Sequence, residues 1–307
     1  MQAAIVVLIV TVITFILLRA IPGNPAVAVL GPAAYRNPAA LAQFNAQYGF
    51  DKPWFSQYLL WLGHLLQGNL GFSWKLDQPV ASLLGQRLGK TVILVGISTI
   101  VALIIAIPVG LLQAVRRNKP VDYLFTSLSF LFYAAPTFFV GTVLILVFSE
   151  KLGWFGPEAP QGGIVSDFTD WRDLVLPVAT LALVTIALFS RYMRSAVLDN
   201  ITEDYVRTAR AKGASGRRVL WRHVLRNSLI PIATLVGLSI PGILSGALIT
   251  ESVFNYPGMG FLFYQSAQNQ DYPVLLGFVI VVAIATVVGS LLADIAYAVL
   301  DPRVRYA

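Results

Sequence analysis

Side chains that commonly carry out catalysis or hold metals are scarce in this chain of 307 residues. It has no cysteine, which excludes a thiolate nucleophile, a cysteine metal site and a disulfide. Its two histidines, His64 and His223, lie far apart in the sequence, which argues against a histidine metal site. No histidine lies on an apolar run next to the isolated serines, so a nucleophile–base pair is not indicated. These residues argue against an enzyme and against a resident metal.

Residues 85–91 (GQRLGKT) come closest to a phosphate-binding loop. The nucleotide-binding pattern needs four residues between its glycines, whereas three separate Gly85 from Gly89. A phosphate-binding loop should also follow a buried strand and begin the helix of a soluble domain, whereas residues 85–91 stand at the start of a long apolar run. We interpret it as a polar entry into that run, with Lys90 at a membrane interface, and expect no nucleotide or other cofactor on this chain.

A row of polar side chains lies in the last apolar run. Thr286, Ser290 and Asp294 recur every four residues, so they share one helix face. A carboxylate in a membrane helix is costly unless it is paired or hydrated. Two interpretations stay open: a translocation path along this face, or an ion pair of Asp294 with a basic loop at the inner interface, which we favour. Further candidates for the path or a gate are Ser239, Ser245 and Glu251.

The most distinctive polar segment is the basic stretch 191–227. It holds nine of the chain's 22 lysines and arginines and lies between two apolar runs. Asn200 could cap a helix, because Glu203 three positions later could bond back to it. Gly213 follows two basic residues and is expected to end that helix. The apolar stripe of the predicted helix is Ile201, Tyr205 and Ala209.

A second helix is expected directly after the first. Ser215 can cap it, and it would run from about residue 216 to 226. Its inward residues would be Val219, Leu220, Val224 and Leu225. Two capped helices with a glycine corner are more structured than contact with anionic lipid requires. We therefore favour a docking element that fits a groove of a partner over a solvated basic surface.

The elements that position these residues are long apolar runs. Hydrophobic residues make up 57% of the chain and charged residues 12%, against about 25% charged in soluble domains. Runs of nearly 20 uncharged residues match the thickness of a bilayer, and only helices cross it in single segments of that length. We expect an all-α polytopic membrane protein with six transmembrane helices, the first retained rather than cleaved as a signal. The runs are 3–18, 91–114, 125–148, 174–190, 229–250 and 274–300.

The placement of charge predicts the orientation. With the N-terminus inside, the inner segments hold 14 lysines and arginines and the longer outer segments hold seven. This bias follows the positive-inside rule, so both termini are expected in the cytoplasm. The net charge of +7 is explained by orientation, and no nucleic-acid partner is expected.

The outer segment after the first run is too long for a simple connector. Aromatic and leucine residues at helical spacing predict short amphipathic helices over the outer face. Trp54, Trp61 and Trp74 could anchor these helices at the membrane interface, which we favour. The alternative is a scoop or lid that meets a partner or the substrate.

Two stretches carry a resemblance to a known family. Residues 204–214 (DYVRTARAKGA) and 217–231 (RRVLWRHVLRNSLIP) resemble the coupling loop of ABC importer permeases, in particular of the dipeptide and oligopeptide branch. Arg207, Thr208 and Ala209 stand where the general pattern has Glu-Ala-Ala, and Gly213 matches its glycine. Residues 251–260 (ESVFNYPGMG) are similar to another signature of this branch. Residues 17–25, 57–58 and 68–71 are typical of its first permease subunit, similar to dipeptide permease B.

The resemblance implies a type I ABC importer permease fold. Its parts would be a first transmembrane helix (1–21), an extracytoplasmic segment (22–90), a five-helix core (91–300) with a cytoplasmic coupling loop (191–228), and a cytoplasmic tail (301–307). The implied partners in a bacterial plasma membrane are a second permease, two ATPase domains carrying ATP and Mg²⁺, and an outside binding protein or lipoprotein. Expected ATPase-coupling residues are Asp204, Tyr205, Arg207, Ala209, Lys212, Gly213, Arg217, Arg218 and Arg222.

The expected cargo is a di- or oligopeptide, moved by alternating access. Nickel chelates, glutathione or another small solute stay open as substrates of the same machinery. An ion-coupled secondary carrier is a distant alternative, because it should show inverted repeats and several intramembrane charges.

Overall fold

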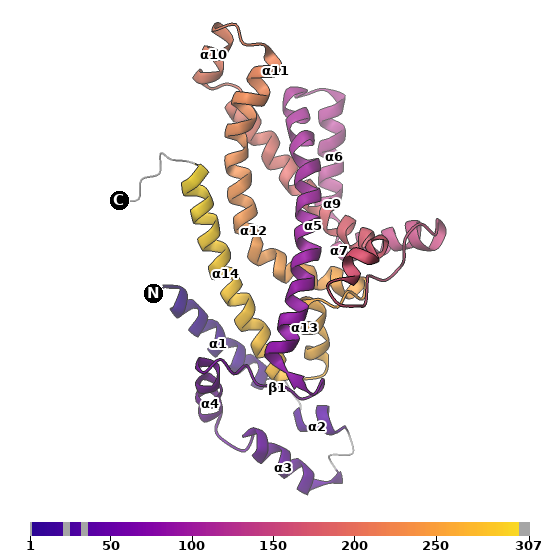
Figure 1. Ribbon diagram of the computed structural model, residues 1–307, viewed down its shortest axis with the longest axis vertical. Helices are drawn as coiled ribbons and strands as arrows, with labels where there is room; N and C mark the ends of the chain where they lie inside the picture. Colours follow the sequence, from indigo (N-terminus) through magenta and orange to yellow (C-terminus); the bar gives the residue numbers. More distant parts are fainter. Residues whose placement is uncertain (1, 21–24, 32–35, 301–307) are drawn as a thin grey trace. The chain divides into compact units, whose positions relative to one another are not determined.

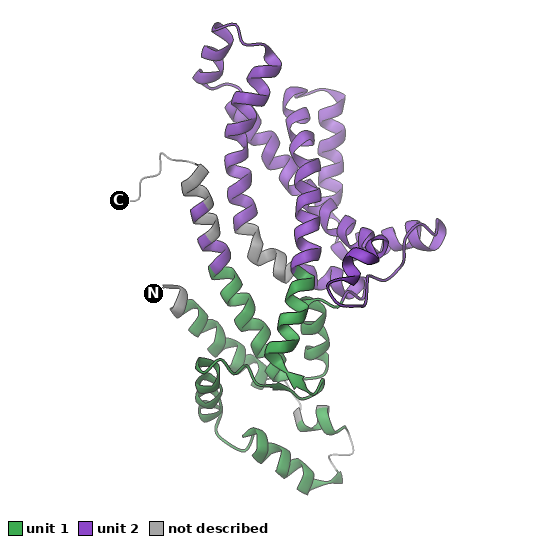
Figure 2. Ribbon diagram, viewed as in Figure 1, with its two compact units in different colours: residues 1–91, 257–287 green, residues 92–256, 288–307 purple. Residues whose placement is uncertain are grey.

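The computed structural model describes residues 2–20, 25–31 and 36–300, and helices dominate this part of the chain. It divides into two compact units (Figure 2). The first unit contains residues 1–91 and 257–287, and the second contains residues 92–256 and 288–307. Two long helices, α5 (Val80–Val115) and α14 (Tyr272–Leu300), contribute residues to both units.

The first unit contains the segment between the first two apolar runs. After α1 (Gln2–Ala20), the chain forms α2 (Pro25–Leu30), α3 (Pro38–Tyr48) and α4 (Trp54–Leu66) (Figure 1). A short antiparallel hairpin follows, β1 (Phe72–Ser73) with β2 (Gln78–Pro79), and α13 (Met259–Gln268) completes the unit. The predicted short helices of the outer segment are therefore present as helices. The unit has a core contributed by α5, α13 and α14: Val80, Leu83, Leu84, Met259, Leu262, Val274 and Phe278.

Asp271 fastens the hairpin to the turn between α13 and α14. Its carboxylate accepts hydrogen bonds from the Ser73 hydroxyl and from the backbone N–H groups of Trp74 and Lys75, both at 3.3 Å. Asp271 is 1% exposed, so these three donors take the place of water around a buried charge. The hairpin is held by this one side chain as well as by its own short ladder.

Replacing Asp271 with alanine is expected to destabilise the first unit by about 2–3 kcal/mol, because three donors lose their acceptor in a buried place. Thermal unfolding of the purified chain and protease cleavage within residues 72–79 measure the effect. Asp51→Ala removes an exposed carboxylate of the same unit and serves as the control. An unchanged cleavage rate in Asp271→Ala would contradict the fastening role.

The second unit is a helical bundle. It contains α6 (Pro120–Ala134), α7 (Thr137–Leu144) with the π-helix η2 (Ile145–Lys151), α8 (Ser166–Thr169) and α9 (Trp171–Asn200). These are followed by α10 (Asp204–Ala211), α11 (Gly216–Arg218), the π-helix η3 (Val219–Val224) and α12 (Leu225–Val253). Helix α9 packs against α6, α7 and α12, so it is the central helix of this unit.

Close packing of α5 on α9 depends on a glycine. A Cβ atom on Gly110 would lie 2.6 Å from Met193 Cβ and 2.6 Å from the Ser190 carbonyl oxygen. Real Cβ atoms do not come this close, so any larger residue would force the two helices apart. Gly110 thus serves the contact between the two helices.

All six predicted runs fall in helices, with one correction to their geometry. Among the described residues, α5, α9 and residues 272–291 of α14 are long and apolar enough to span a membrane. The third run is not one straight helix, because α6 and the α7–η2 helix meet at a bend of 105°. Pro136 lacks an N–H, and Ala135 before it is extended (ψ 131°), which interrupts the helical hydrogen bonds. The first run has a shorter apolar helix, described as Ile5–Ala20, and α12 contains side chains outside the described set.

The phosphate-loop resemblance at residues 85–91 has no loop in the structure. These residues lie inside α5, which begins at Val80 rather than at the start of the predicted run. Lys90 is 3% exposed and the adjacent Thr91 hydroxyl accepts a hydrogen bond from Met259 N–H, so protein covers this position, and its place at a membrane interface stays a prediction. Helix α13 folds over this end of α5 and covers it, which local sequence could not indicate.

Candidate functional site

The part of the basic segment between α9 and α12, residues 201–224, forms a compact element, called the basic element below. Helices α10 and α11 lie at one end of these two long helices (Figure 1). The predicted cap at Asn200 is wrong, because α9 continues through this residue and Glu203 takes the N-cap position of α10. Asn200 instead donates from Nδ2 to the Ala196 carbonyl oxygen (2.8 Å) and accepts from the Tyr205 hydroxyl (2.7 Å). It ties the end of α9 to α10.

Gly213 ends the first helix as predicted. Its φ is +80°, the left-handed backbone in which a Cβ is costly. Its N–H bonds to the Arg210 carbonyl oxygen (2.9 Å), and the Ala214 N–H bonds to that of Ala209 (3.1 Å). This pair of bonds is the Schellman arrangement, which satisfies carbonyls that the helix end leaves open. The corner between the two helices therefore has one defined geometry.

The second helix also begins as predicted. The Ser215 hydroxyl accepts from the Arg218 N–H at 3.4 Å and caps α11. From there α11, η3 and α12 follow one another without a break. Any displacement of the basic element is therefore applied directly to α12.

A buried cluster fixes the element to the bundle. Val206, Val219 and Val224 are between 0 and 2% exposed, and the predicted inward residues Leu220 and Leu225 pack beside them. The cluster continues through Leu111, Met193, Val197 and Ile232 of the long helices. Burying one apolar side chain of this size contributes about 1.5–3 kcal/mol to stability, so the element is anchored and not a loose loop. Sequence analysis missed Val206, although its place beside the stripe of Ile201, Tyr205 and Ala209 is a usable signal.

The surface of the basic element contains a cationic groove. The groove is about 610 Å³ in volume and has six of the nine predicted coupling residues in its wall: Tyr205, Ala209, Lys212, Gly213, Arg218 and Arg222. Arg217 lies with Arg218 and Arg222 in an adjoining hollow, beside Trp221, which is 54% exposed. Asp204 and Arg207 form an exposed pair at 3.4 Å outside both hollows. The sequence analysis did not single out Trp221, although an exposed tryptophan among arginines is a common feature of protein interfaces.

An ion pair holds α9 to α6 in the same unit. Arg194 Nε and Nη2 donate to the two carboxylate oxygens of Asp122 at 2.8 and 2.9 Å. The Asp122 side chain is 4% exposed and that of Arg194 is 29% exposed. Asp122 also accepts from the Asn118 N–H at 3.0 Å. A bidentate pair of this kind fixes orientation as well as distance.

Glu251, a candidate for the path or gate, is fully buried at the end of α12. Its backbone carbonyl accepts from the Tyr256 N–H at 2.8 Å, and the Tyr256 hydroxyl donates to Asp167 Oδ2 at 2.8 Å. Burial, and then the nearby carboxylates, raise the pKa of Tyr256 above its ordinary value, so its hydroxyl stays a donor. Glu251 and Tyr256 of the 251–260 signature therefore take part in a packed cluster.

The remaining path candidates stay predictions. Thr286 is exposed, with its hydroxyl donating to the Val282 carbonyl oxygen at 2.8 Å, and Ser290 is also exposed. Ser239, Ser245 and Asp294 have side chains outside the described set. In the part of the chain that the structure describes, no group of three or more possible metal ligands occurs.

Two family profiles match this chain. Residues 106–306 match "Binding-protein-dependent transport system inner membrane component", and residues 1–95 match the N-terminal part of the same kind of component. The chain belongs to this family. It is a multi-pass permease subunit of an ABC importer of the inner membrane, and not a catalytic subunit. An ABC importer permease works with a partner permease, ATPases and a binding protein.

Several similar proteins are also permeases. The chain is 41% identical to the oligopeptide transport system permease protein AppB of Bacillus subtilis, over 97% of this chain and 94% of that protein. It is 32% identical to the dipeptide permease DppB of Alkalihalophilus pseudofirmus, covering 96% and 94%. It is 35% identical to the glutathione permease GsiC of Escherichia coli, covering 97% and 94%.

A solved structure supports the fold. The inward-facing MetNI methionine ABC transporter matches with a TM-score of 0.53 over 70% of this chain and 97% of that chain, at 18% identity. The all-α polytopic permease fold expected from the sequence is thereby confirmed. So is the assignment to the peptide branch of ABC importer permeases, by the relatives above.

Proposed function

We propose that this permease imports di- or oligopeptides, with ATP hydrolysis on separate ATPase domains driving alternating access. The names of its relatives support a peptide substrate, AppB for oligopeptides and DppB for dipeptides. Glutathione, itself a small peptide, is the second candidate because the GsiC permease is 35% identical to this chain.

The observation that carries the coupling role is the anchored two-helix element with its cationic groove. The Schellman bonds at Gly213 fix the corner between its helices. Val206, Val219 and Val224 fix the face that packs against the long helices. Its second helix is continuous with α12. A rigid element of this kind can transmit a two-state change from a docked ATPase to membrane helices. We propose that each ATPase change of state moves this element, and α9 and α12 with it.

The assembly that this function requires is specific. We propose a second, similar permease, two ATPase domains that bind ATP and Mg²⁺, and an extracytoplasmic binding protein or lipoprotein. The positive-inside bias supports cytoplasmic termini and a cytoplasmic basic element. Residues 22–90 would then lie on the extracytoplasmic side.

The test is uptake by vesicles that contain the chain with its companion subunits and the binding protein. We expect a labelled dipeptide or tetrapeptide to accumulate only with ATP on the ATPase side, and unlabelled glutathione to compete only if it shares the site. Vesicles without the ATPase domains are the control and should show no accumulation. Uphill uptake by the chain alone on an ion gradient would contradict the proposal.

A further inference from the structure

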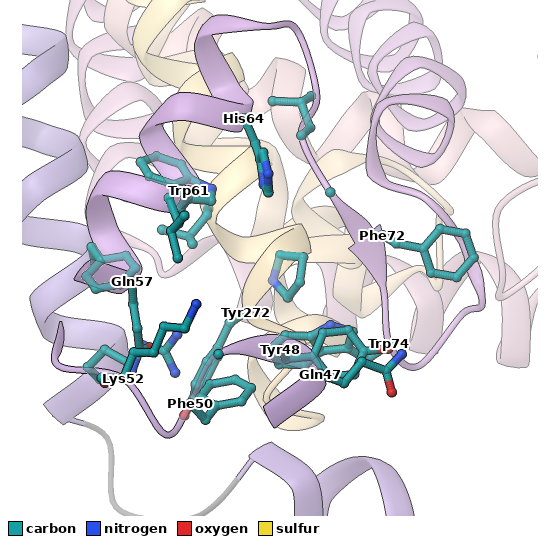
Figure 3. Close-up of a pocket in the computed structure, with 18 of the residues that line it drawn as sticks. Gln47, Tyr48, Phe50, Lys52, Gln57, Trp61, His64, Phe72, Trp74 and Tyr272 are labelled. Atoms are coloured by element: carbon teal, nitrogen blue, oxygen red, sulfur yellow. The ribbon is translucent and has the colours of Figure 1, made fainter. Parts of the chain in front are cut away.

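A pocket in the first unit contains a cation that has no carboxylate partner, and an amide oxygen that has no donor, among the residues that the structure describes. It measures about 370 Å³, within the range of small-molecule sites. Residues of α1, α4, the end of α3, β1 and the start of α14 form its wall (Figure 3). The coupling element does not account for it, and its two polar residues, Arg19 and Gln57, lie in the stretches 17–25 and 57–58 that resemble the first permease subunit.

Arg19 supplies the cation. Its guanidinium carbon lies 4.3 Å from the ring centre of Phe50, 5.2 Å from that of Phe15 and 5.6 Å from that of Tyr272. Aromatic rings stabilise the charge over their faces but accept no hydrogen bonds in the guanidinium plane. Of the carboxylates that the structure describes, none lies within ion-pair distance of Arg19. Its N–H groups therefore remain available to an anion, and a planar carboxylate matches their geometry with two bonds.

Gln57 supplies the acceptor. It is 7% exposed, and its Nε2 donates to the Lys52 carbonyl oxygen at 2.6 Å. This bond fixes the amide, because the reversed orientation would place two oxygens against each other. Its Oε1 has no hydrogen-bond donor among the described residues, although burying an acceptor without a donor is costly. The N–H of a ligand in the pocket would satisfy it.

We propose that this pocket binds the C-terminal end of a peptide, with the carboxylate on Arg19 and a backbone N–H on Gln57 Oε1. The exposed Lys52 adds positive charge at the pocket, and Trp61 and Trp74 offer aromatic surface to a side chain. A lipid phosphate could also bind Arg19, but an ionised phosphate has no donor for Gln57. That the ligand is the transported cargo rests on the proposed function. The binding groups of Arg19 and Gln57 are features of the structure and do not depend on that function.

The experiment measures binding by calorimetry to the full-length chain in nanodiscs of zwitterionic lipid. The probes are the dipeptide alanyl-leucine and the same dipeptide with a C-terminal amide. We expect the amide to bind about tenfold more weakly, because it loses a charge-assisted pair of hydrogen bonds. Arg19→Gln should weaken the free acid to the level of the amide and leave the amide unchanged, with Arg19→Lys intermediate. Gln57→Leu should weaken both probes by about fivefold.

Arg36→Gln removes an exposed cation of the same unit and should leave both affinities unchanged. Thermal unfolding of each variant separates lost binding from lost folding. Equal binding of the acid and the amide by the unaltered chain overturns the proposal, and so does a preference for the acid that survives in Arg19→Gln. Binding of short-chain phosphatidylglycerol that depends on Arg19, with no such dependence for the peptide, assigns the pocket to lipid phosphate and also overturns it.

The binding assay needs neither ATP nor transport, so the two proposals fail separately. Binding that depends on Arg19 without ATP-driven peptide uptake overturns the proposed function alone. Normal uptake without such binding overturns the pocket alone.

Discussion

Replacing Ala209 with phenylalanine is expected to abolish docking of the ATPase domain and ATP-driven uptake. Ala209 lies in the wall of the cationic groove, and its helix is held from below by Val206. A benzyl group there occupies the space that a partner side chain would enter, and the anchored helix cannot move aside. Loss of a central contact at a protein interface weakens binding by about 2 kcal/mol or more, roughly thirtyfold. Co-purification of the ATPase with the tagged chain and its affinity for nanodiscs measure this effect.

Ala211→Phe is the matched control. Ala211 lies on the same helix, is exposed and lies outside the groove wall, so this variant should retain the ATPase. Because Ala209 also touches the buried cluster, a second pair of variants tests the surface without altering the packing. Lys212→Glu reverses a charge in the groove wall, whereas Arg210→Glu reverses one outside it. Retention of the ATPase by both Ala209→Phe and Lys212→Glu would show that the groove is not its docking site.

The local structure of the basic element could largely be predicted from its sequence. Gly213 after Arg210 and Lys212 predicts a helix end, and Ser215 predicts the next helix start. Both signals depend only on hydrogen bonds between residues a few positions apart. The inward faces of the two helices follow from apolar periodicity in the same way. The capping pattern at Asn200 is misleading because it does not reveal whether the residues before it are already helical. Here the long α9 continues past the apolar run that predicted it.

Features that depend on distant parts of the chain could not be predicted. Asp122 and Arg194 are 72 positions apart, and nothing local indicates that they meet. The polar pattern around Lys90 does not reveal that this side chain is buried where α13 covers the end of α5. Pro136 lies within the third apolar run, but many membrane helices tolerate proline, so the bend of 105° does not follow from the sequence. The pocket at Arg19 needs Tyr272, which only the fold brings near.

Removing the carboxylate of Asp122 is expected to destabilise the second unit by about 3 kcal/mol. Asp122→Ala leaves Arg194 without its bidentate partner and the Asn118 N–H without its acceptor, in a place where the carboxylate is 4% exposed. Breaking one side of a buried pair costs about 3–5 kcal/mol, and the partial exposure of Arg194 places the effect at the lower end. Thermal unfolding followed by circular dichroism in detergent should show a lower Tm than the unaltered chain.

A double-mutant cycle separates the pair from the rest of its surroundings. The double variant Asp122→Ala with Arg194→Ala should be less destabilised than the sum of the two single variants, because neither charge is then left alone. Asp199→Ala and Arg117→Ala remove exposed charges from the same unit and should each change stability by less than about 0.5 kcal/mol. Strictly additive losses would mean that the two side chains do not act as a pair. Helix α9 leads directly into the basic element, and the Asp122–Arg194 pair joins α9 to α6. If the pair is confirmed, the α6–α9 contact is what keeps α9 in place when the basic element moves. ATP-driven uptake in Asp122→Ala vesicles should then fall more than ATPase binding does.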